Sequence, residues 1–99
     1  MIHLGIIGCG WVVSYAHVKA LQLLTDIVKV VALADPSPGR NELVGGELGV
    51  PPSHWYADYS KMIVQEELDC VDLALPHFLH ESITIDCVQH GLHVFSDKP

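Results

Sequence analysis

Residues 2–10 read IHLGIIGCG, a short apolar run closed by glycines at positions 8 and 10. The run from Ile2 to Ile7 is typical of a strand buried on both faces. From Val12 onward the apolar residues recur at three- and four-residue steps, which predicts a helix. The valine-rich run from Ile27 to Ala34, closed by Asp35, predicts a second buried strand. This order of strand, glycine turn, helix and strand predicts a parallel, right-handed crossover unit.

Helices and strands continue to alternate along the rest of the chain. The spacing of apolar residues predicts three more helices, at residues 40–48, 59–66 and 79–90. Three more strands are predicted, at residues 55–56, 70–75 and 92–95. Strict alternation predicts an α/β fold, a doubly wound parallel sheet (Rossmann fold) of about five strands in the order 3-2-1-4-5. In such sheets ligands bind beyond the carboxyl ends of the strands.

The composition is that of one globular domain. The chain has 99 residues, of which 49% are hydrophobic and 17% charged. Five Lys and Arg against twelve Asp and Glu give a net charge of −7, which argues against a nucleic-acid partner because phosphate neutralisation needs clustered basic side chains. No uncharged run is long enough to cross a membrane. Three widely separated cysteines indicate neither a disulfide framework nor a zinc ribbon, so a reducing, cytoplasmic location is expected.

The two glycines of the first turn are candidates for binding a dinucleotide phosphate. Gly8 permits a tight turn after the first strand, and Gly10 lets the backbone approach a pyrophosphate at the helix N-terminus. The full GxGxxG pattern would place a small residue at position 13, where this chain has Val13. An ordinary glycine turn is therefore an alternative interpretation of the same residues.

Asp35 is the candidate that selects the coenzyme. It follows the second strand, 22 residues beyond Val13, close to the roughly 20 expected for the acid that binds the adenosine ribose. Its carboxylate would repel a 2′-phosphate, so NAD is favoured over NADP. Two alternatives remain. Asp35 and Pro36 also suit a plain turn at a strand end, and the nearby Arg40 is compatible with NADP.

Three segments in order resemble the N-terminal domain of the glucose-fructose oxidoreductase, inositol dehydrogenase and MocA (Gfo/Idh/MocA) family. They are the start, LGIIGCGW at residues 4–11, the segment VALADP at 31–36, and the end, GLHVFSDKP at 91–99. The most specific element is the Glu-Lys-Pro signature of the family, present here as Asp97-Lys98-Pro99. A Pro-x-x-x-His pattern is present as Pro76 to His80.

The resemblance implies an NAD(P)-dependent oxidoreductase in which Lys98 is catalytic. The lysine would hydrogen-bond the substrate hydroxyl and assist its deprotonation while hydride passes to the nicotinamide. Pro76 and His77 would lie on the nicotinamide side of the site. Asp97, Leu75 and His77 depart from the residues common in the family, which leaves the nicotinamide contacts open. The predicted cofactor-binding residues are Gly8, Cys9, Gly10, Trp11, Val12, Asp35, Pro36, Arg40, Leu75, Pro76, His77, His80, Asp97 and Lys98.

The family normally has a sixth strand and a second, substrate-binding domain, so residues 1–99 are interpreted as a truncated NAD(P)-binding domain. The full-length protein is expected to oxidise or reduce a sugar- or polyol-like small molecule and to form a homo-oligomer. The alternative function is a non-catalytic dinucleotide-binding sensor or assembly module. No metal site is predicted, because no carboxylate completes a ligand set around the pairs His77 with His80 and His90 with His93.

Overall fold

The computed structural model describes residues 1–8, 23, 26–74 and 80–96, and it confirms the predicted parallel sheet. The strand order is β3-β2-β1-β4-β5, the predicted 3-2-1-4-5. The strands are β1 (Ile2–Ile7), β2 (Val28–Ala34), β3 (Trp55–Tyr56), β4 (Cys70–Leu73) and β5 (His93–Ser96). The described helices are α2 (Pro38–Leu48), the 3₁₀ turn η2 (Pro52–His54), α3 (Tyr59–Gln65) and α4 (His80–Gln89).

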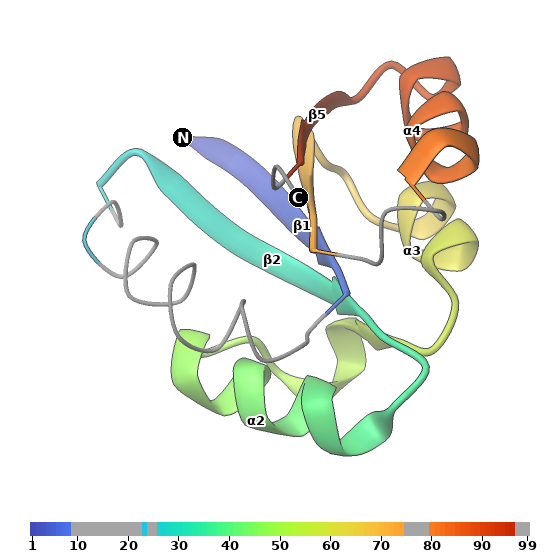
Figure 1. Ribbon diagram of the computed structural model, residues 1–99. Coiled ribbons are helices and arrows are strands. Elements are labelled where there is room, and N and C mark those ends of the chain that lie inside the picture. Colours follow the sequence, from blue (N-terminus) through green and yellow to red (C-terminus); the bar gives the residue numbers. More distant parts are fainter. Residues whose placement is uncertain (9–22, 24–25, 75–79, 97–99) are drawn as a thin grey trace.

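The sheet separates two hydrophobic layers. Helix α2 covers one face, and α3 with α4 covers the other (Figure 1). Leu4 and Ile6 of β1 contact the layer beneath α2, whereas Ile7 joins the layer beneath α3 and α4. Side chains of a strand alternate between the faces, so a strand covered on both sides must be apolar throughout. This is why the short runs of Ile, Val, Leu and Ala could be recognised as central strands.

Local interactions fix the ends of the helices. The Asp58 carboxylate accepts a hydrogen bond from the Ser60 backbone N–H at 2.9 Å and caps the N-terminus of α3. Helix α2 ends at Leu48 and is followed by Gly49, whose φ of 73° lies in the left-handed region that glycine adopts at low cost. Helix α2 begins at Pro38, two residues before the predicted start, because a proline has no N–H to leave unpaired in the first turn.

Two other predicted boundaries need comment. Strand β4 ends at Leu73 and not at Leu75, because β1 ends at the register partner of Leu73, which is Ile7. The helix predicted from Val12 lies outside the described residues, except that Leu23 is helical.

A close approach between α2 and β3 anchors the helix to its face of the sheet. A Cβ atom at Gly45 would lie 2.6 Å from the Trp55 Cε2 and Cζ2 atoms, so only glycine fits beneath the indole. The Trp55 Nε1–H donates to the Val50 carbonyl at 2.9 Å and holds the ring in place. The packing of α2 against the edge of the sheet therefore depends on a residue without a side chain.

Candidate functional site

All five strands end in one row at the carboxyl edge of the sheet. The register pairs Ala34 with Tyr56, Ile7 with Ala34, Ile7 with Leu73, and Leu73 with Ser96. We call this row, with the described residue that follows a strand end, the carboxyl rim. Gly8 and Asp35 are therefore neighbours on the rim, each one position beyond the end of its strand.

Backbone hydrogen bonds continue across the rim past the strand ends. The Gly8 N–H donates to the Ala34 carbonyl at 2.8 Å, and the Asp35 N–H donates to the Tyr56 carbonyl at 2.9 Å. On the other side of β1, the Ala74 N–H donates to the Ile7 carbonyl at 2.9 Å. These bonds fix the positions of the two predicted binding residues, because each is tied to the adjacent strand.

Gly8 has the geometry of a residue that starts a tight turn. It is buried and has a φ of 90°, a conformation that residues with a Cβ atom rarely adopt. The next residues of the predicted phosphate turn, Cys9 to Val12, lie outside the described part of the chain. The glycine at the end of β1 thus meets the backbone requirement of a phosphate-binding turn, and it also satisfies the plain-turn interpretation.

Asp35 is buried at the rim, with only 6% of its surface exposed. Its Oδ1 atom accepts a hydrogen bond from the Ser37 backbone N–H at 2.8 Å, which closes an Asx turn. The turn-forming role foreseen for Asp35 and Pro36 is therefore present. The same hydrogen bond fixes the carboxylate at the rim, where a coenzyme ribose would be bound in a doubly wound sheet.

The structure adds a residue that sequence reasoning missed. Asn41, on α2, is 3% exposed, and its Nδ2 atom lies 3.1 Å from the Asp35 carbonyl and 3.1 Å from the Tyr56 carbonyl. It therefore joins the rim ends of β2 and β3. One signal could have identified it, because Asn41 shares the inward stripe of α2 with Val44 and Leu48 at helical spacing and is its polar member.

The remaining predicted residues fall into two groups. Pro36 and Arg40 are exposed, and Arg40 lies in the first turns of α2, just before Asn41 in the chain. His80 is the first residue of α4. The other predicted site residues lie outside the described ranges, namely Cys9, Gly10, Trp11, Val12, Leu75, Pro76, His77, Asp97 and Lys98.

Side-chain pairs that include neither Gly8 nor Asp35 link elements of the fold. The Tyr56 hydroxyl donates to the Glu66 carboxylate at 2.6 Å, and this bond, together with burial, raises the pKa of Tyr56 to about 12. His54 Nδ1 lies 2.7 Å from the same Glu66 oxygen. The Tyr59 hydroxyl donates to the Asp86 carboxylate and thereby joins α3 to α4. Each pair fixes two elements relative to each other.

The described cysteines lack the exposure and the lowered pKa that are typical of a reactive thiol. Cys70 and Cys87 are buried free thiols. Burial raises the pKa of Cys70, and it raises that of Cys87 to about 11. Both side chains are therefore thiols at neutral pH, whereas nucleophilic attack requires the thiolate.

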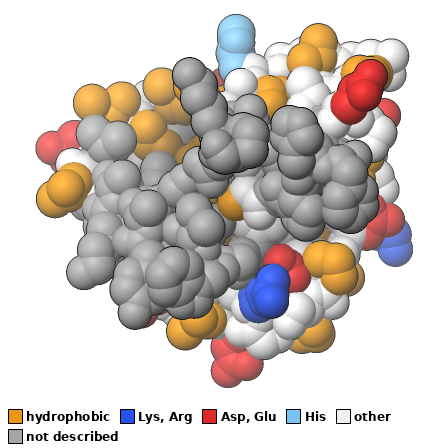
Figure 2. Space-filling view, viewed as in Figure 1, with side chains coloured by type: hydrophobic (Ala, Val, Ile, Leu, Met, Phe, Trp, Pro, Cys, Tyr) orange, Lys and Arg blue, Asp and Glu red, His pale blue; other side chains and the backbone are white. Residues whose placement is uncertain are grey.

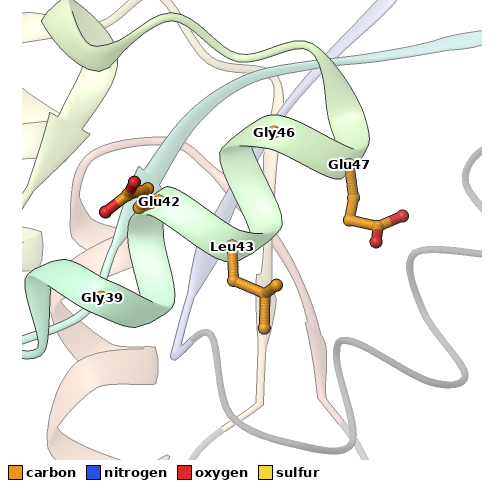
Figure 3. Close-up of a pocket in the computed structure, with 5 residues that line it drawn as sticks. All are labelled: Gly39, Glu42, Leu43, Gly46 and Glu47. Atoms are coloured by element: carbon orange, nitrogen blue, oxygen red, sulfur yellow. The ribbon is translucent and has the colours of Figure 1, made fainter.

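A hollow on the surface lies along α2 and not at the rim. It has a volume of about 600 Å³, and its described lining is Gly39, Glu42, Leu43, Gly46 and Glu47 (Figure 3). Two glycines leave the helix surface bare there, and the charged side chains of the described lining are the carboxylates Glu42 and Glu47. These two carboxylates do not favour the phosphates of a dinucleotide. We therefore take as the candidate site the rim, where the predicted binding residues Gly8 and Asp35 lie.

The described surface offers little to other ligand classes. Among the described residues on the face shown in Figure 2, basic side chains stand apart from one another and form no patch. Residues 1–8, 23, 26–74 and 80–96 include no group of three or more His, Cys, Asp or Glu side chains placed to hold a metal ion. None of the helices described is long and apolar enough to span a bilayer.

Comparison with known proteins relates this chain to dehydrogenases. The model of the Gfo/Idh/MocA oxidoreductase family, an NAD-binding Rossmann fold, matches residues 2–99. Inositol 2-dehydrogenase 1 from Saccharopolyspora erythraea is 32% identical over 98 residues, which are 99% of this chain and 28% of that protein. The scyllo-inositol 2-dehydrogenase (NAD(+)) of Bacillus subtilis is 30% identical over 86 residues, which are 87% of this chain and 25% of that protein.

A solved structure shows the same architecture. Scyllo-inositol dehydrogenase from Lactobacillus casei, crystallised with NAD(H) and scyllo-inositol, matches with a TM-score of 0.82 at 28% identity. The match covers 100% of this chain and 28% of that one. The chain thus spans 25–28% of the length of the dehydrogenases named here.

Proposed function

This chain belongs to the Gfo/Idh/MocA oxidoreductase family, as its NAD-binding Rossmann domain, and we propose that it serves an enzyme that transfers hydride between a sugar- or polyol-type hydroxyl and nicotinamide. The observation that carries the proposal is the pairing of Gly8 and Asp35 at adjacent strand ends, linked by the hydrogen bond from Gly8 N–H to the Ala34 carbonyl. A glycine with a positive φ after the first strand, beside a buried acid after the second, is typical of sheets that bind a dinucleotide.

The described residues fit the coenzyme. The positive φ of Gly8 brings bare backbone to the end of β1, where a pyrophosphate would lie. The Asp35 carboxylate is fixed by Ser37 and would accept hydrogen bonds from the ribose hydroxyls. A 2′-phosphate would meet the same negative charge, which favours NAD over NADP.

We assign the substrate side to Lys98. Strand β5 ends at Ser96 in the rim row, two residues before Lys98 in the sequence, which supports a role for this amine at the same rim. The bound coenzyme supplies the hydride acceptor. The lysine would hydrogen-bond the hydroxyl being oxidised and stabilise the charge that develops as its proton leaves. Inositol dehydrogenases among the relatives support a polyol substrate.

The buried free thiols Cys70 and Cys87 support a reducing compartment such as the cytoplasm.

Formation of reduced coenzyme by the purified full-length protein, with NAD and a panel of polyols and sugars, tests the proposal. We expect turnover that falls by about 10²- to 10⁴-fold in Lys98→Ala, because general acid–base groups contribute on that order. The matched control is Lys61→Ala, which removes an exposed lysine of α3 and leaves turnover unchanged. Coenzyme binding without turnover in the wild type would favour the non-catalytic dinucleotide-binding module instead.

A further inference from the structure

The Asn41 side chain occupies a position where only a double hydrogen-bond donor fits. Its Nδ2 atom faces two carbonyl oxygens at 3.1 Å, one from Asp35 and one from Tyr56. A primary amide nitrogen carries two N–H donors, enough for both acceptors. The Tyr56 carbonyl also accepts from the Asp35 N–H at 2.9 Å, so three polar groups meet at one point of the rim. A carboxylate in this place would face carbonyl oxygens with no proton to donate.

Asn41 also takes part in the hydrogen bonds at the start of α2. The N-cap residue of α2, Ser37, makes no side-chain capping hydrogen bond. The backbone N–H groups of Arg40 and Asn41 donate to the Ser37 carbonyl at 3.2 and 3.4 Å, and the Ser37 N–H donates to Asp35 Oδ1. The Asn41 side chain then closes the loop by bonding the Asp35 carbonyl. The short connection from Asp35 to α2 is thus held at both ends by Asn41.

We propose that Asn41 is a positioning residue for coenzyme selection, acting through Asp35. It does not contact the coenzyme. It holds the peptide of Asp35 and the start of α2 in one arrangement, so that the carboxylate stays where it accepts a ribose hydroxyl and repels a 2′-phosphate. The inference deepens the proposed function, on which it rests, by assigning part of the NAD preference to a buried amide.

The test compares the affinities of the purified protein and its Asn41→Ala variant for NADH and for NADPH. Loss of the two donors frees the Asp35 turn, so we expect NADH to bind about tenfold more weakly while NADPH affinity stays within about threefold. The decisive measurement is a double-mutant cycle with Asp35→Asn. If Asn41 acts through the Asp35 charge, Asn41→Ala changes the NADH-to-NADPH preference in the wild type and leaves it unchanged in the Asp35→Asn background. An equal change in both backgrounds would overturn the proposal.

A structural control separates positioning from general destabilisation. Val44→Ala shortens a fully buried side chain of the same helix, one turn further on, and removes no bond to Asp35 or Tyr56. Hydrogen exchange of the Ser37 backbone amide, followed without coenzyme, should accelerate about tenfold in Asn41→Ala and less in Val44→Ala once their stabilities are matched. Unaltered exchange at Ser37 in Asn41→Ala overturns the positioning role. Wild-type protein that binds neither coenzyme refutes the proposed function, and the exchange result still decides the role of Asn41.

Discussion

Replacing Asp35 with asparagine separates the two roles of this side chain. The asparagine oxygen can still accept from the Ser37 N–H, so the turn persists, but the negative charge is lost. We expect NADPH to bind at least tenfold more tightly relative to NADH, since one removed charge repulsion is worth more than about 1.4 kcal/mol. Fluorescence titration with each coenzyme measures this ratio. An unchanged ratio would remove Asp35 from the coenzyme site.

Replacing either of two adjacent glycines of α2 with alanine should change the free energy of unfolding in opposite directions. Gly45→Ala places a Cβ 2.6 Å from the Trp55 ring, which is bonded to the Val50 carbonyl and cannot move without breaking that bond. Overpacking should outweigh the gain in helix propensity and lower the free energy of unfolding by about 1–3 kcal/mol. A Cβ at Gly46 meets nothing within 4 Å in the described part of the chain, so Gly46→Ala should raise the free energy of unfolding by up to about 1 kcal/mol. Urea denaturation of both variants tests the packing, which is wrong if the two shifts have the same sign.

The candidate site was only partly predictable at the level of single residues. The rim positions of Gly8 and Asp35 could be predicted, because each comes directly after a buried strand. Asn41 could not, because its two acceptors lie 6 and 15 residues away in sequence and meet only when β2 and β3 pair. The sequence shows only that Asn41 is a polar residue among the apolar positions of one helix face.

At the level of elements, the contact between α3 and α4 predicts a change at alkaline pH. The hydrogen bond from the Tyr59 hydroxyl to Asp86 raises the pKa of Tyr59 from 10.0 to about 12. A group with a raised pKa in the folded state stabilises fully below its unfolded pKa, and this contribution is lost as pH rises through the folded value. We therefore expect wild-type stability to fall between pH 10 and pH 12 more steeply than that of Tyr59→Phe.

Urea midpoints measured across this pH range for the two proteins provide the test. Tyr59→Phe keeps the ring and its packing, so a difference in slope reports the hydroxyl alone. Near neutral pH the variant should be less stable by about 1 kcal/mol, the usual net contribution of one hydrogen bond. Parallel curves would show that the pair contributes nothing to the contact between α3 and α4.

Strands and helices could be predicted where a local sequence pattern is enough to determine them. Strand β1 is an apolar run covered on both faces, and α3 begins at an Asp that caps it, so both were evident in the sequence. The ends of elements differed from the prediction where an adjacent strand determines them. Strand β4 ends at Leu73 because its partner β1 ends opposite that residue, and no pattern within residues 70–75 contains that information.

At the scale of the whole molecule, a ligand at the carboxyl rim should stabilise the entire fold. The rim residues are bonded to β1, β2 and β3, whose side chains form both hydrophobic layers. A ligand that binds only the folded state adds RT ln(1 + [L]/Kd), about 2.7 kcal/mol at one hundred times Kd. If Asp35→Ala weakens NADH tenfold, the same NADH concentration adds only about 1.4 kcal/mol to that variant.

Thermal unfolding with and without NADH measures both increments in one experiment. The matched control is Glu67→Ala, which removes an exposed acid lining a groove with His3 and Lys29, near the amino ends of β1 and β2. Because Glu67 is far along the strands from the rim, its variant should gain as much from NADH as the wild type. A gain that is equal in Asp35→Ala and the wild type would mean that the coenzyme binds without Asp35. No gain in any of the three proteins would mean that the rim does not bind NADH, and the pairing of Gly8 with Asp35 would then be a feature of the fold alone.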